Sequence, residues 1–149
     1  MSARSLDMAE SFVQRAQNKE NEARQEVERW HYAESISASQ ECIELSMKVI
    51  FLLLTDSYPR RHDFKEEEFE PLLDKIPKEL QYYNFPRLYL LHRLWSGFYT
   101  VSKYGYNKFG TGPEKLFKKE EAELALRHAG DCRNAAYALF QRIKYPPRV

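Results

Sequence analysis

The sequence contains little glycine and no long apolar run. Glycine supplies only five of the 149 residues, whereas 30% of the residues are charged, and this balance favours helix over sheet. The longest apolar run, Val49–Leu54, is too short to span a bilayer, and the N-terminus lacks the basic-then-apolar order of a signal peptide. We therefore expect a soluble cytoplasmic protein that does not enter a membrane.

Cysteine is also scarce, and its two copies are far apart. Cys42 and Cys132 have no paired spacing of the kind that builds a zinc site. Each falls inside a helical pattern, which indicates a small core residue in a reducing compartment. The sequence therefore predicts no metal and no other cofactor.

An excess of charge of one sign is missing as well. Lysine and arginine number 23 and aspartate and glutamate 22, so the net charge is +1. No global positive field would draw such a chain to nucleic acid or to an anionic membrane. Binding of a nucleotide or RNA must therefore come from a local patch.

What the sequence does have is a repeated helical spacing of apolar residues. Apolar positions three, four or seven apart predict four long helices, near residues 6–30, 31–54, 84–101 and 118–143, of which the second should be the most buried. No strand-like alternation stands out. We predict a single all-α domain over residues 1–149, an up-and-down bundle of four long helices and one short helix, with its core at 6–143 and a frayed tail at 144–149.

Capping residues and prolines in the sequence mark the ends of the short helix and the start of the third long helix. Asp63 and Glu66 have the form of a capping box, which predicts a short helix from this point to Pro77. Asn84 followed by Pro86 is typical of an N-cap and first helical turn.

The first candidate site is "SYPRRHDF" (Ser57–Phe64), where Arg60 and Arg61 precede His62. Two guanidinium groups beside an imidazole are suited to gripping a phosphate. The alternative is that the arginines are solvated loop residues and that His62 packs beside the capping Asp63. Both interpretations remain open from sequence.

The second candidate is the pair Arg87 and His92. A metal-independent ribonuclease needs a base for the 2′-hydroxyl and a cation for the charge that develops on the phosphate, and these two residue types supply both. Positions five apart on a straight helix diverge by about 140°, so only a kink or a second subunit would bring them together. Arg24 and His31 form a similar pair, but about one such match is expected by chance.

Glu28 and His31 form a Glu-x-x-His pattern like those of di-iron bundles. Such a site needs two of these motifs, and the sequence has no second one. Trp30–Tyr32 more simply forms the corner between the first two helices.

The third candidate is the loop within "KYGYNKFGTGPEK" (Lys103–Lys115). Lys103, Tyr104 and Lys108 are interleaved with further aromatic residues, a pattern able to stack on bases while holding phosphates. The alternative is that the tyrosines anchor the helix end and the lysines are solvated.

Four segments in order resemble a known family. They are "ISASQECIELSMKVIFLLL" (Ile36–Leu54), "SYPRRHDF", "SKYGYN" (Ser102–Asn107) and "EEAELALRHAGDCRNAAYALFQRI" (Glu120–Ile143). This order resembles a HEPN domain over about residues 6–143. The family often has Pro then His-Asp-Leu after its second helix, which Pro59, His62 and Asp63 echo. A tyrosine motif often ends its third helix, as Tyr104 does here.

The resemblance implies a helical bundle, usually a homodimer, often encoded beside a minimal nucleotidyltransferase and recurrent in toxin–antitoxin and defence systems. Many members are ribonucleases with an Arg-polar start and a His four to six positions on. Arg133-Asn134 matches this start, but no histidine follows, and Leu88 replaces the polar residue after Arg87. We therefore expect a domain without catalytic activity that binds a nucleotide or a partner protein. The alternative is a metal-independent endoribonuclease acting on RNA through Arg87 and His92 at a dimer interface.

Overall fold

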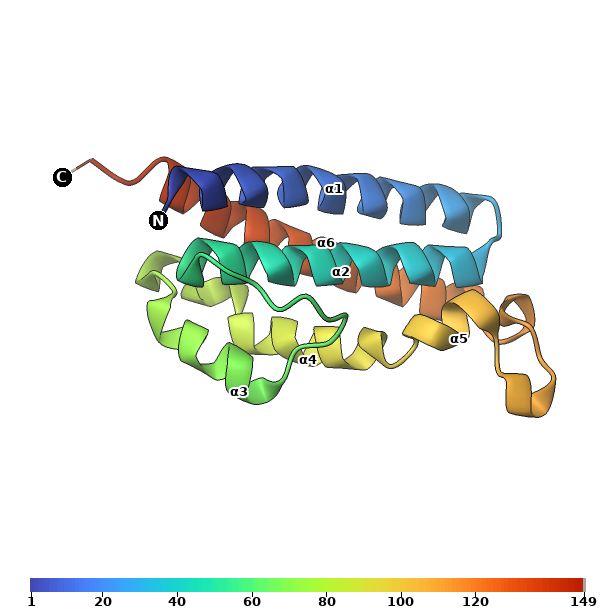
Figure 1. The fold of residues 1–149 in the computed structure, drawn as a ribbon. Coiled ribbons are helices and arrows are strands. Elements are labelled where there is room, and N and C mark those ends of the chain that lie inside the picture. Colours follow the sequence, from blue (N-terminus) through green and yellow to red (C-terminus); the bar gives the residue numbers. More distant parts are fainter. Residues whose placement is uncertain (149) are drawn as a thin grey trace.

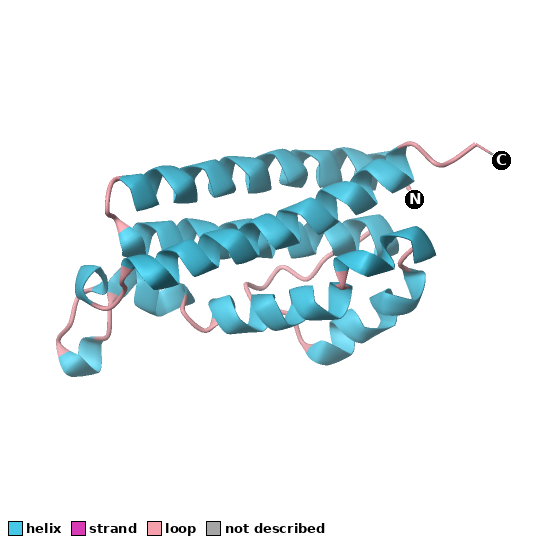
Figure 2. Ribbon diagram, turned by 180° about the vertical axis from the view of Figure 1, so that it is seen from behind, coloured by secondary structure: helices cyan, strands magenta, loops and turns pink. Residues whose placement is uncertain are grey.

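The computed structural model describes residues 1–148 and shows a helical bundle (Figures 1 and 2). Val149, the last residue of the predicted tail, lies outside the described residues. Three long helices, α1 (Ala3–Glu28), α2 (Tyr32–Thr55) and α6 (Lys119–Lys144), run along one another. None of the helices in residues 1–148 is long and apolar enough to cross a membrane.

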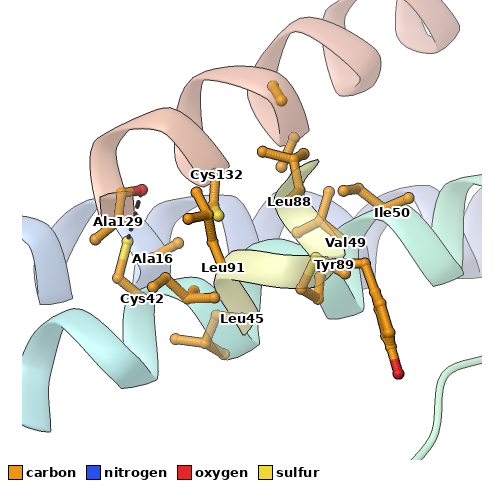
Figure 3. Close-up of a cluster of buried hydrophobic side chains, with 14 of the residues drawn as sticks. Ala16, Cys42, Leu45, Val49, Ile50, Leu88, Tyr89, Leu91, Ala129 and Cys132 are labelled. Carbon is orange, nitrogen blue, oxygen red and sulfur yellow. Dashed lines mark hydrogen bonds between the residues drawn. The ribbon is translucent and has the colours of Figure 1, made fainter. Parts of the chain in front are cut away.

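The central helix of the bundle is α2, as its sequence predicts. It packs against α1, α4, α5 and α6, and 17 of its 24 residues are buried. Its apolar residues form the core with small residues of the neighbouring helices, which allow the helices to approach closely. Figure 3 shows one part of this core, where the Cys42 thiol donates to the carbonyl of Ala129 at 3.7 Å. Cys42 and Cys132 are both buried in the core, as predicted.

Short helices cover the remaining side of the bundle. The predicted short helix is a single α-turn, α3 (Glu66–Phe69), which continues as a 3-10 helix, η1 (Glu70–Lys75), and is followed by η2 (Lys78–Tyr83). The predicted cap at Asp63 is wrong: the carboxylate of Glu68 accepts the backbone N–H of Lys65 at 2.9 Å instead. Phe64 is buried before the helix, and Lys65 has an extended backbone with φ −81° and ψ 151°, so the helix begins only at Glu66.

The predicted third long helix is broken in two, although the all-α bundle itself is confirmed. Its parts are α4 (Phe85–Ser96) and α5 (Tyr99–Tyr104). Asn84 caps α4 as predicted, because its side chain accepts the N–H of Arg87 at 3.3 Å. The break lies at Ser96 and Gly97, a residue pair at which helices commonly kink.

The loop after α5 projects from one end of the bundle (Figure 1). It contains two single turns of 3-10 helix, η3 (Asn107–Phe109) and η4 (Pro113–Lys115). Two backbone hydrogen bonds between Tyr106 and Thr111, of 2.8 and 3.2 Å, close it. Gly105 permits this closure, because a Cβ there would lie 2.3 Å from the carbonyl oxygen of Thr111.

Candidate functional site

An open cleft of about 620 Å³ lies where α1, α4 and α6 meet. Its polar wall consists of Glu20, Arg24, Arg87, Arg127, His128, Asp131 and Asn134. Three arginines and a histidine therefore line one cavity, whereas only two of its lining residues are acidic. We call this group of residues the arginine cleft.

Both carboxylates of the arginine cleft are already paired. Glu20 is buried, accepts from Arg24 at 3.3 Å and is also bonded to Arg133. Gly130 leaves room for this carboxylate, since a Cβ there would lie 3.2 Å from the Glu20 Oε2. Asp131 is paired with Arg87 at 2.9 Å.

Arg127 differs from the other arginines of the cleft. Its side chain is exposed, and it makes no ion pair with any residue of 1–148. A guanidinium without a carboxylate partner keeps its donors available for an anionic ligand. The cleft therefore offers at least one cation that needs no rearrangement before it binds a phosphate.

His128 is held in the cleft by the core behind it. The indole Nε1–H of Trp95, a residue only 3% exposed, donates to Nδ1 of His128 at 3.0 Å. Partial burial lowers the pKa of His128, and the positive charge of Arg87 lowers it further. The imidazole is thus favoured in its neutral form at the wall of the cleft.

The stretch Ser57–Phe64, the first site expected from sequence, makes intramolecular contacts. Nδ1 of His62 lies 2.9 Å from Oε1 of Glu44, and the imidazole stacks on Tyr99 with ring centroids 4.2 Å apart. Arg61 is paired with Glu68. The guanidinium of Arg60 lies over the ring of Tyr58, 5.8 Å from its centroid. The three basic residues are therefore close in sequence, but no two of them share a partner.

The structure does not bring Arg87 and His92 together within one chain. Helix α4 is continuous between them, and Arg87 faces the arginine cleft. His92 is 1% exposed, and its Nε2 accepts the backbone N–H of Phe64 at 3.0 Å. Burial lowers the pKa of His92 to about 4, so this imidazole is a neutral structural acceptor near neutral pH.

The aromatic loop presents some of its predicted residues and uses others internally. The Lys103 ammonium is paired with Glu41 at 2.9 Å and lies over the ring of Tyr99. Tyr104 and Lys108 are exposed. Both side chains therefore lie on the surface, and ligand binding by them stays a prediction.

The Glu28–His31 pattern is not assembled as a pair. Nδ1 of His31 lies 2.8 Å from Oε2 of Glu26 rather than near Glu28. Trp30 has a φ of 64° and lies in the turn between α1 and α2, as the corner interpretation predicted. Over the described part of the chain, no three His, Cys, Asp or Glu side chains gather as a metal site would require.

Sequence patterns alone did not point to Arg127 or His128. The local pattern that connects them is short: Arg127 and His128 are neighbours on the last helix, and Asp131 follows one turn later. This spacing places the three side chains on neighbouring faces of the helix. Nothing local connects them to Arg87, which is 44 positions away from its partner Asp131. The cleft is therefore a product of the tertiary structure.

Comparison with protein-family models found one match. The model of the HEPN domain covers residues 9–138, which include all the residues of the arginine cleft. Searches among curated proteins and among solved structures found no match.

Proposed function

Because the chain belongs to the HEPN domain family, we propose that it is a binding domain without catalytic activity, and that its ligand is a nucleotide held in the arginine cleft. The observation that carries the proposal is the convergence of Arg24, Arg87 and Arg127 on one cavity. Guanidinium groups bind phosphate oxygens through paired N–H donors, which makes a phosphate-bearing ligand the best chemical fit.

The surroundings of His92 and His128 support binding rather than cleavage. A general base must be exposed to its substrate and able to accept a proton. His92 is enclosed in the core, and Nδ1 of His128 already accepts from Trp95. Neither arrangement favours the ribonuclease alternative with Arg87 and His92.

We also propose that the protein acts as a homodimer and engages a partner protein, for which the family suggests a minimal nucleotidyltransferase in a toxin–antitoxin or defence system. Leu90 and Leu94 support the first part, because they lie one turn apart on α4 and are 68% and 46% exposed. Together with Pro86 they form an exposed apolar stripe on this helix. The stripe lies beside Arg87, so a second copy bound there would adjoin the arginine cleft.

Isothermal titration calorimetry with AMP, ADP, ATP and a dinucleotide tests the nucleotide proposal. We expect the wild type to bind at least one of them, and Arg127→Ala to weaken that affinity about tenfold, because one charge-assisted contact is lost. Arg127 makes no ion pair within residues 1–148, so its replacement should leave the fold unchanged.

Arg4→Ala is the matched control, since Arg4 is an exposed arginine on α1 about 30 Å along the helix from Arg24. It should leave the affinity unchanged. The proposal fails if no nucleotide produces heat with the wild type, or if Arg127→Ala binds as tightly as Arg4→Ala.

A further inference from the structure

We infer that Trp95 is a positioning residue which holds His128 as a neutral hydrogen-bond donor, with its proton on Nε2, toward a phosphate oxygen in the arginine cleft. The inference rests on the proposed function for the identity of the ligand. It goes further in assigning a tautomer to His128 and a role to a tryptophan that lies behind the cleft.

The geometry of the pair determines the tautomer. An indole N–H can only donate, so Nδ1 of His128, 3.0 Å from the Trp95 Nε1, must be the accepting nitrogen. A neutral imidazole that accepts at Nδ1 has its proton on Nε2. Since His128 also lines the cleft, Nε2 is the ring nitrogen left to meet a ligand.

Protonation of His128 would break this arrangement. A proton on Nδ1 would face the indole N–H, and two donors cannot bond to each other. The nearby arginines oppose the extra charge as well, whereas Asp131 favours it. The remaining charged residues that line the cleft are Glu20 and Arg24 of α1, which are paired with each other.

Two consequences follow for the ligand. The neutral N–H of His128 adds a donor to those of the arginines, so the cleft prefers an anionic oxygen acceptor such as that of a phosphate. The same ring has no free lone pair with which to remove a proton from a 2′-hydroxyl. Trp95 thus favours binding of a nucleotide over attack on it.

Nuclear magnetic resonance of the histidine ring nitrogens tests the state of His128 directly. The signals of His128 are identified by their loss in His128→Gln. We expect the Nε2–H tautomer in the wild type between about pH 6 and 8, with a pKa below the ordinary value of His. In Trp95→Phe we expect a mixture of tautomers and a higher pKa.

Binding measured against pH supplies the second readout. The probe is a dinucleoside monophosphate, whose phosphodiester keeps one negative charge over this range. Its affinity for the wild type should change less than about twofold between pH 6 and 8, whereas Trp95→Phe should bind it several-fold more tightly at pH 6 than at pH 8, because a cationic His128 attracts the phosphate.

Trp30→Phe is the control, because Trp30 is the other tryptophan and is 79% exposed at the corner between α1 and α2. It should behave as the wild type in both experiments. If Trp95→Phe does not fold, the tautomer of His128 in the wild type is sufficient to support or overturn the inference.

A wild-type His128 with its proton on Nδ1, or with an ordinary or raised pKa, overturns the inference. So does a Trp95→Phe variant that folds and leaves the His128 ring signals and their titration unchanged. An Nε2–H ring in a protein that binds none of the nucleotides would refute the proposed function, while supporting the control of His128 by Trp95.

Discussion

The backbone N–H of Phe64 donates to Nε2 of His92 at 3.0 Å, and the two rings stack with their centroids 4.6 Å apart. This contact joins the segment after α2 to the middle of α4, across 28 positions of sequence. It satisfies a buried backbone donor that lies in no helix or strand. His92 is therefore part of the framework that holds α4 against α2.

This bond makes stability depend on pH. Burial lowers the pKa of His92 from 6.5 to about 4, so between these values the unfolded chain takes up a proton that the folded chain does not. The free energy of unfolding should therefore fall as the pH drops from about 6.5 to 4, by about 3 kcal/mol at most. Urea denaturation at several pH values measures the slope.

His92→Gln is the control for that slope. It removes the titrating group, so its free energy of unfolding should lack the His92 contribution in this pH range. It should also be less stable than the wild type near neutral pH, by about 1–3 kcal/mol, if the N–H of Phe64 loses its acceptor. Equal slopes in the two proteins would contradict the assignment.

The projecting loop offers a matched pair of glycines. Gly105 and Gly110 both have positive φ, 78° and 63°, but only Gly105 faces a close backbone atom, the Thr111 oxygen. Gly105→Ala should open the loop, whereas Gly110→Ala costs only about 1 kcal/mol of backbone strain. Limited trypsin digestion should cut the Gly105→Ala loop faster, at Lys108 or Lys115. Equal rates for the two variants would refute the close approach.

The basic stretch after α2 is testable without loss of the fold. Arg60 and Arg61 are exposed, Arg60 lies over the ring of Tyr58 and Arg61 is paired with Glu68, so changing both to alanine should leave the free energy of unfolding nearly unchanged. If the arginine cleft is the nucleotide site, the double variant should also keep its affinity within about twofold. A tenfold loss would instead favour the phosphate grip suggested by the sequence.

The exposed stripe on α4 predicts the oligomeric state. Replacing both Leu90 and Leu94 with glutamate should convert a dimer to a monomer in static light scattering, because charge would enter the apolar contact. Met8→Glu is the control, since Met8 is an exposed apolar residue of α1. A wild type that is monomeric at micromolar concentration, or a double variant that is still dimeric, would contradict the proposed homodimer.

The sequence predicts most of the fold because the relevant signals are local. The spacing of apolar residues along α2 and α6 is a property of one helix at a time, and Asn84 caps α4 through an amide three residues away. The family resemblance, carried by the order of such segments, agrees with the match over residues 9–138. The spacing of apolar residues does not predict the break at Gly97, because apolar residues continue on both sides of it.

The candidate site could be predicted only in part. Arg87 was a candidate from sequence, but the spacing paired it with His92, which turns into the core. Its actual partner is Asp131, from another helix. A side chain's neighbours across a bundle depend on helix packing and rotation, which a pattern along one helix does not contain.

The sequence by itself thus determined an all-α bundle, its buried central helix and the core position of both cysteines, because helical period and hydrophobic burial act on residues close together in the chain. Only the tertiary structure decided which polar groups meet. Glu20 reaches Arg133 across 113 positions, and Trp95 reaches His128 across 33. Such contacts exist only once the helices have packed, and they decide which polar side chains bond to one another.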